Sequence, residues 1–265
     1  MKVGFIGLGN MAKAIIGGIL KNEIVAANNI LGSAKTAETK EKVQKEYGIT
    51  VLADNRVVAA ESDVLFLAVK PIFFPEVMEE IKASIKDTTL VISVAAGKTV
   101  EFIEKGLGNP NLKIIRTMPN TPALVGEGCT GVCVNDNVKD DDVELAMKIL
   151  SSFGKAYLVP ERLMDVVGAV SGSSPAFVFM FIEAMADGAV AGGMPRKQAY
   201  EFAAQAVLGS AKLVLETGKH PGELKDMVCS PGGTTIEGVK VLEECSLRGS
   251  VMDAMEAVLE KTKRL

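Results

Sequence analysis

The sequence predicts a fold in two parts: an α/β domain over residues 1–160, followed by an all-α domain over residues 161–265. Up to about Val159, short apolar runs alternate with longer segments of mixed polarity, which is typical of a mostly parallel sheet with helices on both faces. After Pro160 the apolar residues recur with helical spacing, and no segment has the pattern of a strand.

Seven apolar runs are expected to be the strands of the first domain. They are Val3 to Ile6, Ile30 to Ser33, Val64 to Val69, Leu90 to Val94, Ile114 to Met118, Gly131 to Val134 and Tyr157 to Val159. Between them, helical periodicity marks Met11 to Leu20, Thr36 to Tyr47 and Pro75 to Ile85. This βαβ repetition accounts for most of the first domain.

Six helices are expected in the second domain: Leu163 to Val170, Pro175 to Gly192, Arg196 to Glu216, Pro221 to Val228, Thr235 to Glu244 and Arg248 to Lys263. The longest are apolar on most faces, as in the run from Ala176 to Ile182. An isolated bundle of this size would leave much of that surface in water, so burial against a second subunit is predicted. Burial wholly within one chain is the alternative.

The composition sets limits on partners and compartment. A net charge of -4 gives no basic surface for a nucleic acid, so no nucleic-acid partner is expected. The N-terminal residues do not form a secretory signal, and Glu183 and Asp187 interrupt the most apolar stretch, which argues against a membrane span. The four cysteines form no C-x-x-C pair and are interpreted as small buried hydrophobic residues, which favours a cytoplasmic location.

A glycine-rich turn follows the first strand and opens the first helix. Its residues, Gly7, Leu8, Gly9, Asn10, Met11 and Ala12, match the G-x-G-x-x-G/A pattern of Rossmann dinucleotide-binding domains. One glycine permits the tight turn, the next lets the backbone approach a pyrophosphate, and the helix N-terminus offers free N–H groups. A glycine-rich turn without a ligand is the alternative.

The end of the second strand indicates which dinucleotide is bound. An Asp or Glu for the ribose hydroxyls of NAD is missing there, and Ser33, Lys35 and Thr36 stand instead. A hydroxyl and an ammonium group suit a phosphate on that ribose, so NADPH is the preferred cofactor. In the alternative, Lys35 is a solvated loop residue and NADH is used as well.

Further candidate cofactor contacts lie where two other strands end, because open α/β sheets bind ligands at their carboxyl edge. They are Ala68, Val69, Lys70 and Pro71 after the third run, and Ala95, Ala96 and Gly97 after the fourth. Lys70 either faces polar groups of the cofactor or lies at the solvated rim of the sheet, and Asn55 has the same two interpretations.

Metal and triad chemistry are not expected. His220 is the only histidine, it precedes Pro221 in a turn, and it is interpreted as structural. No group of His, Cys and carboxylate residues has the spacing of metal ligands.

Several motifs together resemble Δ1-pyrroline-5-carboxylate reductases. Besides the glycine-rich turn, they are Ala68 to Pro71, Arg116 to Pro122, Ser171 to Phe177 and Ser230 to Thr235, and the likeness covers nearly the whole chain. The C-terminal signature is the most specific, with matches at Pro221, Leu224, Val228, Cys229, Ser230, Gly232, Gly233, Thr235, Gly238, Val239, Leu242 and Glu243. Ser174 and Phe177 depart from the Gly and Tyr that family members commonly carry.

The resemblance implies reduction of the ring C=N bond of 1-pyrroline-5-carboxylate to L-proline with NAD(P)H, the last step of proline synthesis. It also implies an interleaved homodimer that can assemble into a decamer of five dimers. Ser33 and Asn55 would lie near the adenosine side of the cofactor, and Ala68, Lys70 and Ala95 near its nicotinamide. In this family the loop that matches Ser230–Thr235 holds the substrate carboxylate and is supplied by the partner subunit.

The physical chemistry of this loop supports the same assignment. Pro231 fixes one dihedral angle, Gly232 and Gly233 adopt conformations closed to other residues, and a helix begins near Thr234 with free N–H donors. The predicted substrate contacts are therefore Ser230, Pro231, Gly232, Gly233, Thr234 and Thr235, and Thr235 is the predicted catalytic residue that orients the ring nitrogen. An ordinary interhelical turn, with Gly as helix stop and Thr as cap, is the alternative.

Three other functions are weighed against this one. A Rossmann reductase for hydroxy acids would normally need an acid–base residue such as Lys in the helical domain. A non-catalytic NADP-sensing module would need the glycine-rich turn but not the second anion site at Ser230–Thr235. A dimeric scaffold would need neither of these two anion sites.

Overall fold

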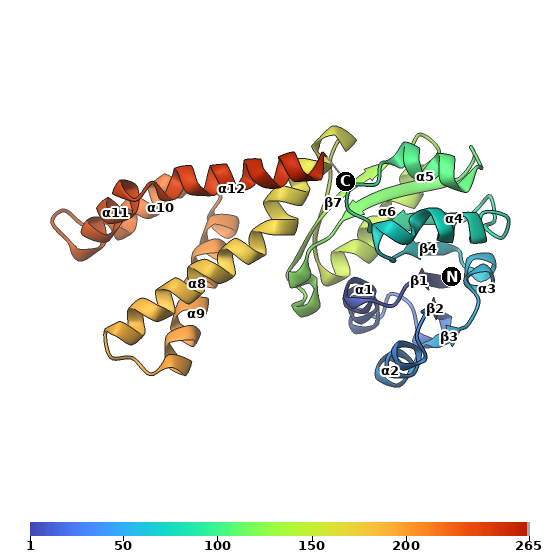
Figure 1. Ribbon diagram of the computed structural model, residues 1–265, viewed down its shortest axis with the longest axis horizontal. Coiled ribbons are helices and arrows are strands. Elements are labelled where there is room, and N and C mark those ends of the chain that lie inside the picture. The colour runs from blue at the N-terminus through green and yellow to red at the C-terminus, as the bar shows by residue number, and fades with distance from the viewer. Residues whose placement is uncertain (264–265) are drawn as a thin grey trace. The chain divides into compact units, whose positions relative to one another are not determined.

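The computed structural model describes residues 1–263 (Figure 1), and its contacts divide the chain into two compact units. The first comprises Met1–Ser173 together with the last described residues, 261–263. The second comprises Ser174–Glu260.

Within the described residues, eight strands form one sheet in the order β3-β2-β1-β4-β5-β6-β7-β8. The strands are β1 Val3–Ile6, β2 Ile30–Ser33, β3 Thr50–Leu52, β4 Val64–Leu67, β5 Leu90–Ser93, β6 Lys113–Met118, β7 Gly128–Val134 and β8 Gly154–Leu158. Every neighbouring pair is parallel except β6 and β7. The chain builds outward from β1 to β3 and then returns to place β4 on the other side of β1, which is doubly wound topology.

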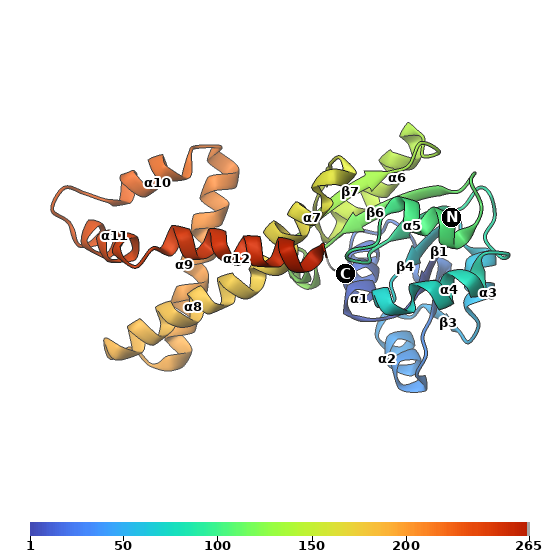
Figure 2. The same cartoon turned by 45° about the horizontal axis from the view of Figure 1, so that its top comes forward.

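Helices cover both faces of this sheet (Figures 1 and 2). The helices α1 Asn10–Lys21, α2 Ala37–Tyr47 and α6 Asp140–Leu150 bury their apolar side chains in one core, while α3 Asn55–Glu61, α4 Phe74–Ile81 and α5 Val100–Leu107 bury theirs in the other. All four residues of β1, β2, β4 and β5 are buried because helices lie on both sides of them. The expected α/β class and mostly parallel sheet are confirmed.

Several expected bounds change. The third and fourth expected strands end at Leu67 and Ser93, because the chain turns away from the sheet at its carboxyl edge. The strand expected at Tyr157 to Val159 runs from Gly154 to Leu158, β7 begins at Gly128, and α4 spans Phe74–Ile81. The strand β3 was not expected at all: although Val51 and Leu52 are apolar, its three residues are too few to show the alternation of a strand.

The helices of the C-terminal part are α7 Met164–Val167, α8 Ser174–Ala191, α9 Arg196–Thr217, α10 Pro221–Val228, α11 Thr234–Glu244 and α12 Leu247–Thr262. The first expected helix, Leu163 to Val170, is instead a 3-10 turn at Glu161–Leu163, then α7, then a π-helical turn at Gly168–Ser173. The other five expected helices are present: α10 has the expected bounds, and the ends of the other four differ from them by at most one residue.

The second unit has a very small core of its own. Where α8 packs on α9, the buried side chains are Ala186, Ala199 and Ala203. Large apolar side chains on the same two helices are in contact with solvent: Phe179 is 62% exposed, Met180 68% and Phe202 62%. This is the wet apolar surface that the sequence predicts for an isolated bundle.

One helical stretch among the described residues, Glu161–Ala191, is long and apolar enough to cross a membrane by length and composition alone. Few of its residues are buried within the chain. Glu183 and Asp187 lie in its second half, and both carboxylates would be costly in hydrocarbon. The absence of a membrane span stays a prediction.

Candidate functional site

The glycine-rich turn connects β1 to α1 as the sequence predicts. Gly7 has φ +94°, a left-handed conformation that side chains rarely adopt. Its N–H donates to the Ser33 carbonyl at 3.0 Å, which ties the turn to the end of β2. Ala12 is completely buried in the core beneath the helix, so a larger side chain would push α1 away from the sheet.

The N-terminus of α1 is open to a ligand. Gly9 is its N-cap residue and provides no side chain to bind the first N–H groups. A Cβ atom added at Gly9 would meet nothing within 4 Å, so the space in front of Asn10 and Met11 is empty of protein. Free N–H groups at the positive end of a twelve-residue helix form a phosphate site. The residues present fit a pyrophosphate.

The other predicted cofactor contacts lie at the carboxyl edge of the same sheet. The Ala68 N–H donates to the Ile6 carbonyl at 2.8 Å, so the β4 extension lies directly beside the turn at Gly7. After β5, Ala95 is buried and its N–H donates to Ser93 Oγ at 3.3 Å. The remaining members of the two segments, Val69, Lys70, Pro71, Ala96 and Gly97, are half-buried or exposed. The structure therefore brings both segments to the carboxyl edge of the sheet, beside β1 and β4, where the strand order reverses.

The side chains at the end of β2 form a chain of hydrogen bonds. The Ser33 hydroxyl donates to Asn55 Oδ1 at 2.6 Å, and Asn55 Nδ2 donates to Glu80 Oε2 at 2.8 Å. Ser33 is 1% exposed and its proton is already engaged. A ligand phosphate would therefore meet Lys35 first, because Lys35 is exposed and its ammonium lies 5.6 Å from the ring centre of Phe73. Thr36 instead caps α2 by accepting from the Thr39 N–H.

Glu80 is a residue that the sequence did not single out. It comes from the last turn of α4 and reaches Asn55 at the start of α3. Neither its helical surroundings nor its spacing indicates that contact, because the two positions meet only when α3 and α4 pack side by side.

The second predicted loop joins α10 to α11. Gly232 has φ +69°, and the Gly233 N–H donates to the Ser230 carbonyl at 3.0 Å, which closes a tight turn after Pro231. A Cβ atom added at Gly233 would lie 2.4 Å from Ser230 Oγ, so only glycine fits there without moving that side chain.

The N-terminus of α11 is uncapped. Gly233 is the N-cap residue and makes no side-chain hydrogen bond, and Thr234 and Thr235 are the first two residues of the helix, both exposed. The alternative in which a threonine caps this helix is wrong. The loop therefore has the same elements as the cofactor turn: glycine at the N-cap and a first helical turn without a side-chain acceptor.

Other candidate groups have structural surroundings. His220 is the N-cap of α10, where its Nδ1 accepts from the Gly222 N–H at 3.1 Å, as expected for a structural residue. Among the residues that the structure describes, no group of three or more His, Cys, Asp or Glu side chains could hold a metal ion. The four cysteines are free, but only Cys133 is buried and Cys245 is exposed, so the expectation of buried cysteines is wrong for Cys245.

Two family models match the chain. The model described as pyrroline-5-carboxylate reductase dimerisation matches residues 161–265. The model described as NADP oxidoreductase coenzyme F420-dependent matches residues 2–97, which include the glycine-rich turn.

Whole-length relatives agree with these matches. A pyrroline-5-carboxylate reductase from Escherichia coli strain K12 is 50% identical and covers 100% of this chain and 98% of its own length. Two solved structures are also similar. The pyrroline-5-carboxylate reductase of Coxiella burnetii is 37% identical with a TM-score of 0.91, covering 99% of this chain and 97% of its own.

The second structure is Plasmodium falciparum pyrroline carboxylate reductase with NADP bound. It is 34% identical with a TM-score of 0.89, and covers 100% of this chain and 97% of its own. Each unit has a helix whose N-cap residue is a glycine without a side-chain cap. Together with the full-length identity, this leads to one assignment: this chain belongs to the pyrroline-5-carboxylate reductase family.

Proposed function

We propose that this protein reduces the ring C=N bond of 1-pyrroline-5-carboxylate to L-proline, the last step of proline biosynthesis. NADPH is the preferred reductant and NADH a second one. The observation that carries this proposal is 50% identity over 264 residues to a pyrroline-5-carboxylate reductase, with almost no part of either chain left unmatched.

The dinucleotide binds across the carboxyl edge of the sheet in this proposal. Its pyrophosphate lies on the open N-terminus of α1, where the space at Gly9 is free of protein. Its adenosine phosphate meets Lys35, while Asn55 is held in one orientation by Ser33 and Glu80. Its nicotinamide lies along the segments that follow β4 and β5.

The substrate is held by the loop between α10 and α11. The first turn of α11 binds the carboxylate through backbone N–H groups, because its N-cap residue, Gly233, has no side chain to cap them. The Thr235 hydroxyl orients the ring nitrogen. We assign this loop to the partner subunit of the cofactor domain that it serves, as in the family.

The reaction needs little acid–base chemistry from the protein. A protonated imine already makes its carbon electrophilic, and the bound nicotinamide supplies the hydride. The work of this chain is to hold the imine carbon in place by its carboxylate and nitrogen and to exclude water. The α10–α11 loop, Cys229–Gly233, contains no Asp, Glu, His, Lys or Arg, which fits this division of work.

The same proposal covers assembly and location. The apolar side chains exposed on α8 and α9 are buried in an interleaved homodimer, which can associate further into a decamer. The enzyme works in the cytoplasm, without a nucleic-acid or membrane partner. The two domains are residues 1–160, which bind the cofactor, and residues 161–265, which dimerise and bind substrate.

A direct test follows loss of NADPH absorbance with 1-pyrroline-5-carboxylate, with a hydroxy-acid and a keto-acid substrate as controls, and is repeated with NADH. We expect turnover with the imine alone. Turnover of the keto acid alone would favour the hydroxy-acid dehydrogenase class, and cofactor binding without any turnover would favour a sensing module.

Thr235→Ala tests the assigned catalytic residue. Loss of one hydrogen bond to the imine nitrogen should lower kcat/KM about tenfold or more, while the Kd for NADPH changes less than about twofold. Thr235→Ser keeps the hydroxyl and should recover most of the activity. Unchanged kinetics in Thr235→Ala would remove this residue from the mechanism.

A further inference from the structure

The motif from Arg116 to Asn120 has no part in the cofactor or substrate contacts described above, although it is one of the motifs that the family shares. Arg116 lies on β6, and its side chain is only 5% exposed. A buried guanidinium is stable only where anions balance it. Its partners therefore indicate what the motif does.

The partners come from consecutive helical turns, Glu161 from the 3-10 turn Glu161–Leu163 and Asp165 from α7. Arg116 Nη1 donates to Glu161 Oε1 at 3.0 Å, and Nη2 donates to Asp165 Oδ1 at 3.2 Å. Their carboxylates bind the same guanidinium, so two like charges that repel each other lie close together there. The guanidinium lies between the two carboxylates, and its attraction to both offsets their repulsion. Because its nitrogens form a rigid fork, one arginine can bind both groups at once.

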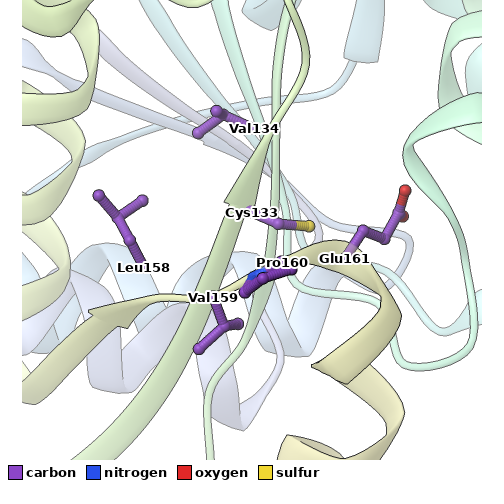
Figure 3. Close-up of a pocket in the computed structure, with 6 residues that line it drawn as sticks. All are labelled: Cys133, Val134, Leu158, Val159, Pro160 and Glu161. Carbon is purple, nitrogen blue, oxygen red and sulfur yellow. The ribbon is translucent and has the colours of Figure 1, made fainter.

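Glu161 also binds a third element. Its Oε1 accepts from the Val100 N–H at 2.8 Å, at the first turn of α5. Figure 3 shows the Glu161 carboxylate and the Cys133 sulfur pointing to one side of a pocket, with Val134 and Leu158 on the other. Burial raises the pKa of the Cys133 thiol to about 11, so this neighbour of Arg116 is neutral near pH 7 and the two carboxylates balance the guanidinium.

The other end of the motif holds the other end of the same segment. Asn120 Nδ2 donates to the Ser171 carbonyl at 2.9 Å, in the π-helical turn Gly168–Ser173, and Asn120 Oδ1 accepts from the Cys129 N–H at 2.8 Å. Arg116 and Asn120 thus fasten the start and the end of the segment 161–173. That segment leads without a break into α8, the first helix of the second unit.

We propose that Arg116 is a positioning residue for imine reduction, which acts by fixing the segment 161–173 from which the substrate-binding unit departs. Asn120 is its second anchor. The proposal rests on the function assigned above, because it concerns how that substrate is held. Arg116 does not touch the reacting atoms. Its loss leaves two repelling carboxylates on a segment that must keep one direction.

The test compares Arg116→Met and Arg116→Lys with the surface control Lys105→Met, which removes an exposed ion pair from α5. We expect Arg116→Met to raise KM for the imine about tenfold or more, because a substrate-binding segment that is no longer fixed must be ordered when the imine binds. The kcat should change less than the KM, and the Kd for NADPH should stay within about twofold. Arg116→Lys, which can reach one carboxylate, should lie between, and Lys105→Met should match the wild type.

A second variant serves if Arg116→Met does not fold. Asp165→Asn keeps the Glu161 bridge and removes one charge, and should raise KM about threefold with NADPH binding intact. Unchanged KM in all Arg116 and Asp165 variants would overturn the proposal. So would an equal loss of NADPH and imine binding, since that would make the cluster a general support of the sheet.

Amide hydrogen exchange separates this proposal from the assigned function. In Arg116→Met or Asp165→Asn, amides in residues 163–173 should exchange faster than in the wild type, while those of β1 and α1 should not. If the wild type does not reduce the imine, the assigned function fails, and the exchange result alone decides whether Arg116 fixes the segment 161–173. Unchanged exchange across residues 163–173 would overturn the proposal that Arg116 fixes this segment, even in an active enzyme.

Discussion

The carbonyl oxygen of Ala68 lies 2.6 Å from the point where a Cβ atom would begin at Gly7. Real Cβ atoms do not approach an oxygen so closely, so the start of the cofactor turn and the end of β4 fit together only if residue 7 has no side chain. Gly9, two residues along, has the opposite surroundings, since nothing of the protein lies within 4 Å of its added Cβ. The two glycines can therefore be told apart by experiment.

Gly7→Ala should damage the fold, whereas Gly9→Ala should damage binding alone. At Gly7 the overlap and the left-handed backbone together should lower the free energy of unfolding by about 2–3 kcal/mol. At Gly9 the backbone has φ -74°, which alanine adopts freely, so stability should change little while the methyl group fills the space meant for phosphate. Urea unfolding and NADPH titration of both variants check this. A Gly9→Ala protein that binds NADPH normally would place the pyrophosphate elsewhere.

Lys35→Ala should reduce the preference for NADPH over NADH about tenfold, because a charged hydrogen bond to phosphate is worth roughly 1.5–3 kcal/mol. Lys42→Ala, which removes an exposed lysine from α2, is the matched control. The measurement is the ratio of kcat/KM with the two cofactors. If the ratio is the same in wild type and Lys35→Ala, then Lys35 is a solvated residue and the discrimination lies elsewhere.

Cys133 should resist alkylation near neutral pH. Because its folded pKa of about 11 is higher than the ordinary thiol value of 9.0, the fold favours the neutral form. The stability that this contributes is fully present below about pH 9 and is lost as pH rises through 11. Iodoacetamide labelling followed by mass spectrometry should find Cys133 slower than the exposed Cys245, and its labelling should accelerate with pH up to about 11. Equal labelling of both at pH 7.5 would contradict this assignment.

Phe179→Glu and Phe202→Glu should weaken the dimer. Each substitution replaces an apolar ring with a charge. The ring is 62% exposed in the single chain and becomes buried against the second subunit in the proposed dimer. Light scattering after size exclusion should find the wild type as a dimer or larger and each variant shifted toward monomer. Ile72→Glu, which alters an exposed apolar residue of the first unit, should leave the mass unchanged. Dimers that survive both substitutions would remove this surface from the interface.

What the sequence predicted well depends on local pattern. The runs that became β1, β2, β4 and β5 are buried on both faces, so apolar residues follow one another without interruption and the strands are legible. The turn from Gly7 to Ala12 is equally local, because its glycines, its strand and its helix are consecutive.

What the sequence could not predict depends on contacts between distant residues. Thr50–Leu52 forms a strand because β2 offers it a partner, whereas its three residues are too few to show a strand pattern by themselves. Glu80 meets Asn55, and Glu161 and Asp165 meet Arg116, across separations that no motif spacing records. The Arg116–Pro122 motif was recognisable as a family trait, but its role needed the positions of its partners.

The three alanines between α8 and α9 have a consequence for how this protein is made. Side chains so small release little free energy when they are buried, so the second unit gains most of its stability only when another copy covers its phenylalanines. A newly synthesised chain would then stay partly folded until it associates with a second copy. The Tm should therefore rise with protein concentration, and the helices of the second unit should unfold at a lower temperature in dilute samples than in concentrated ones.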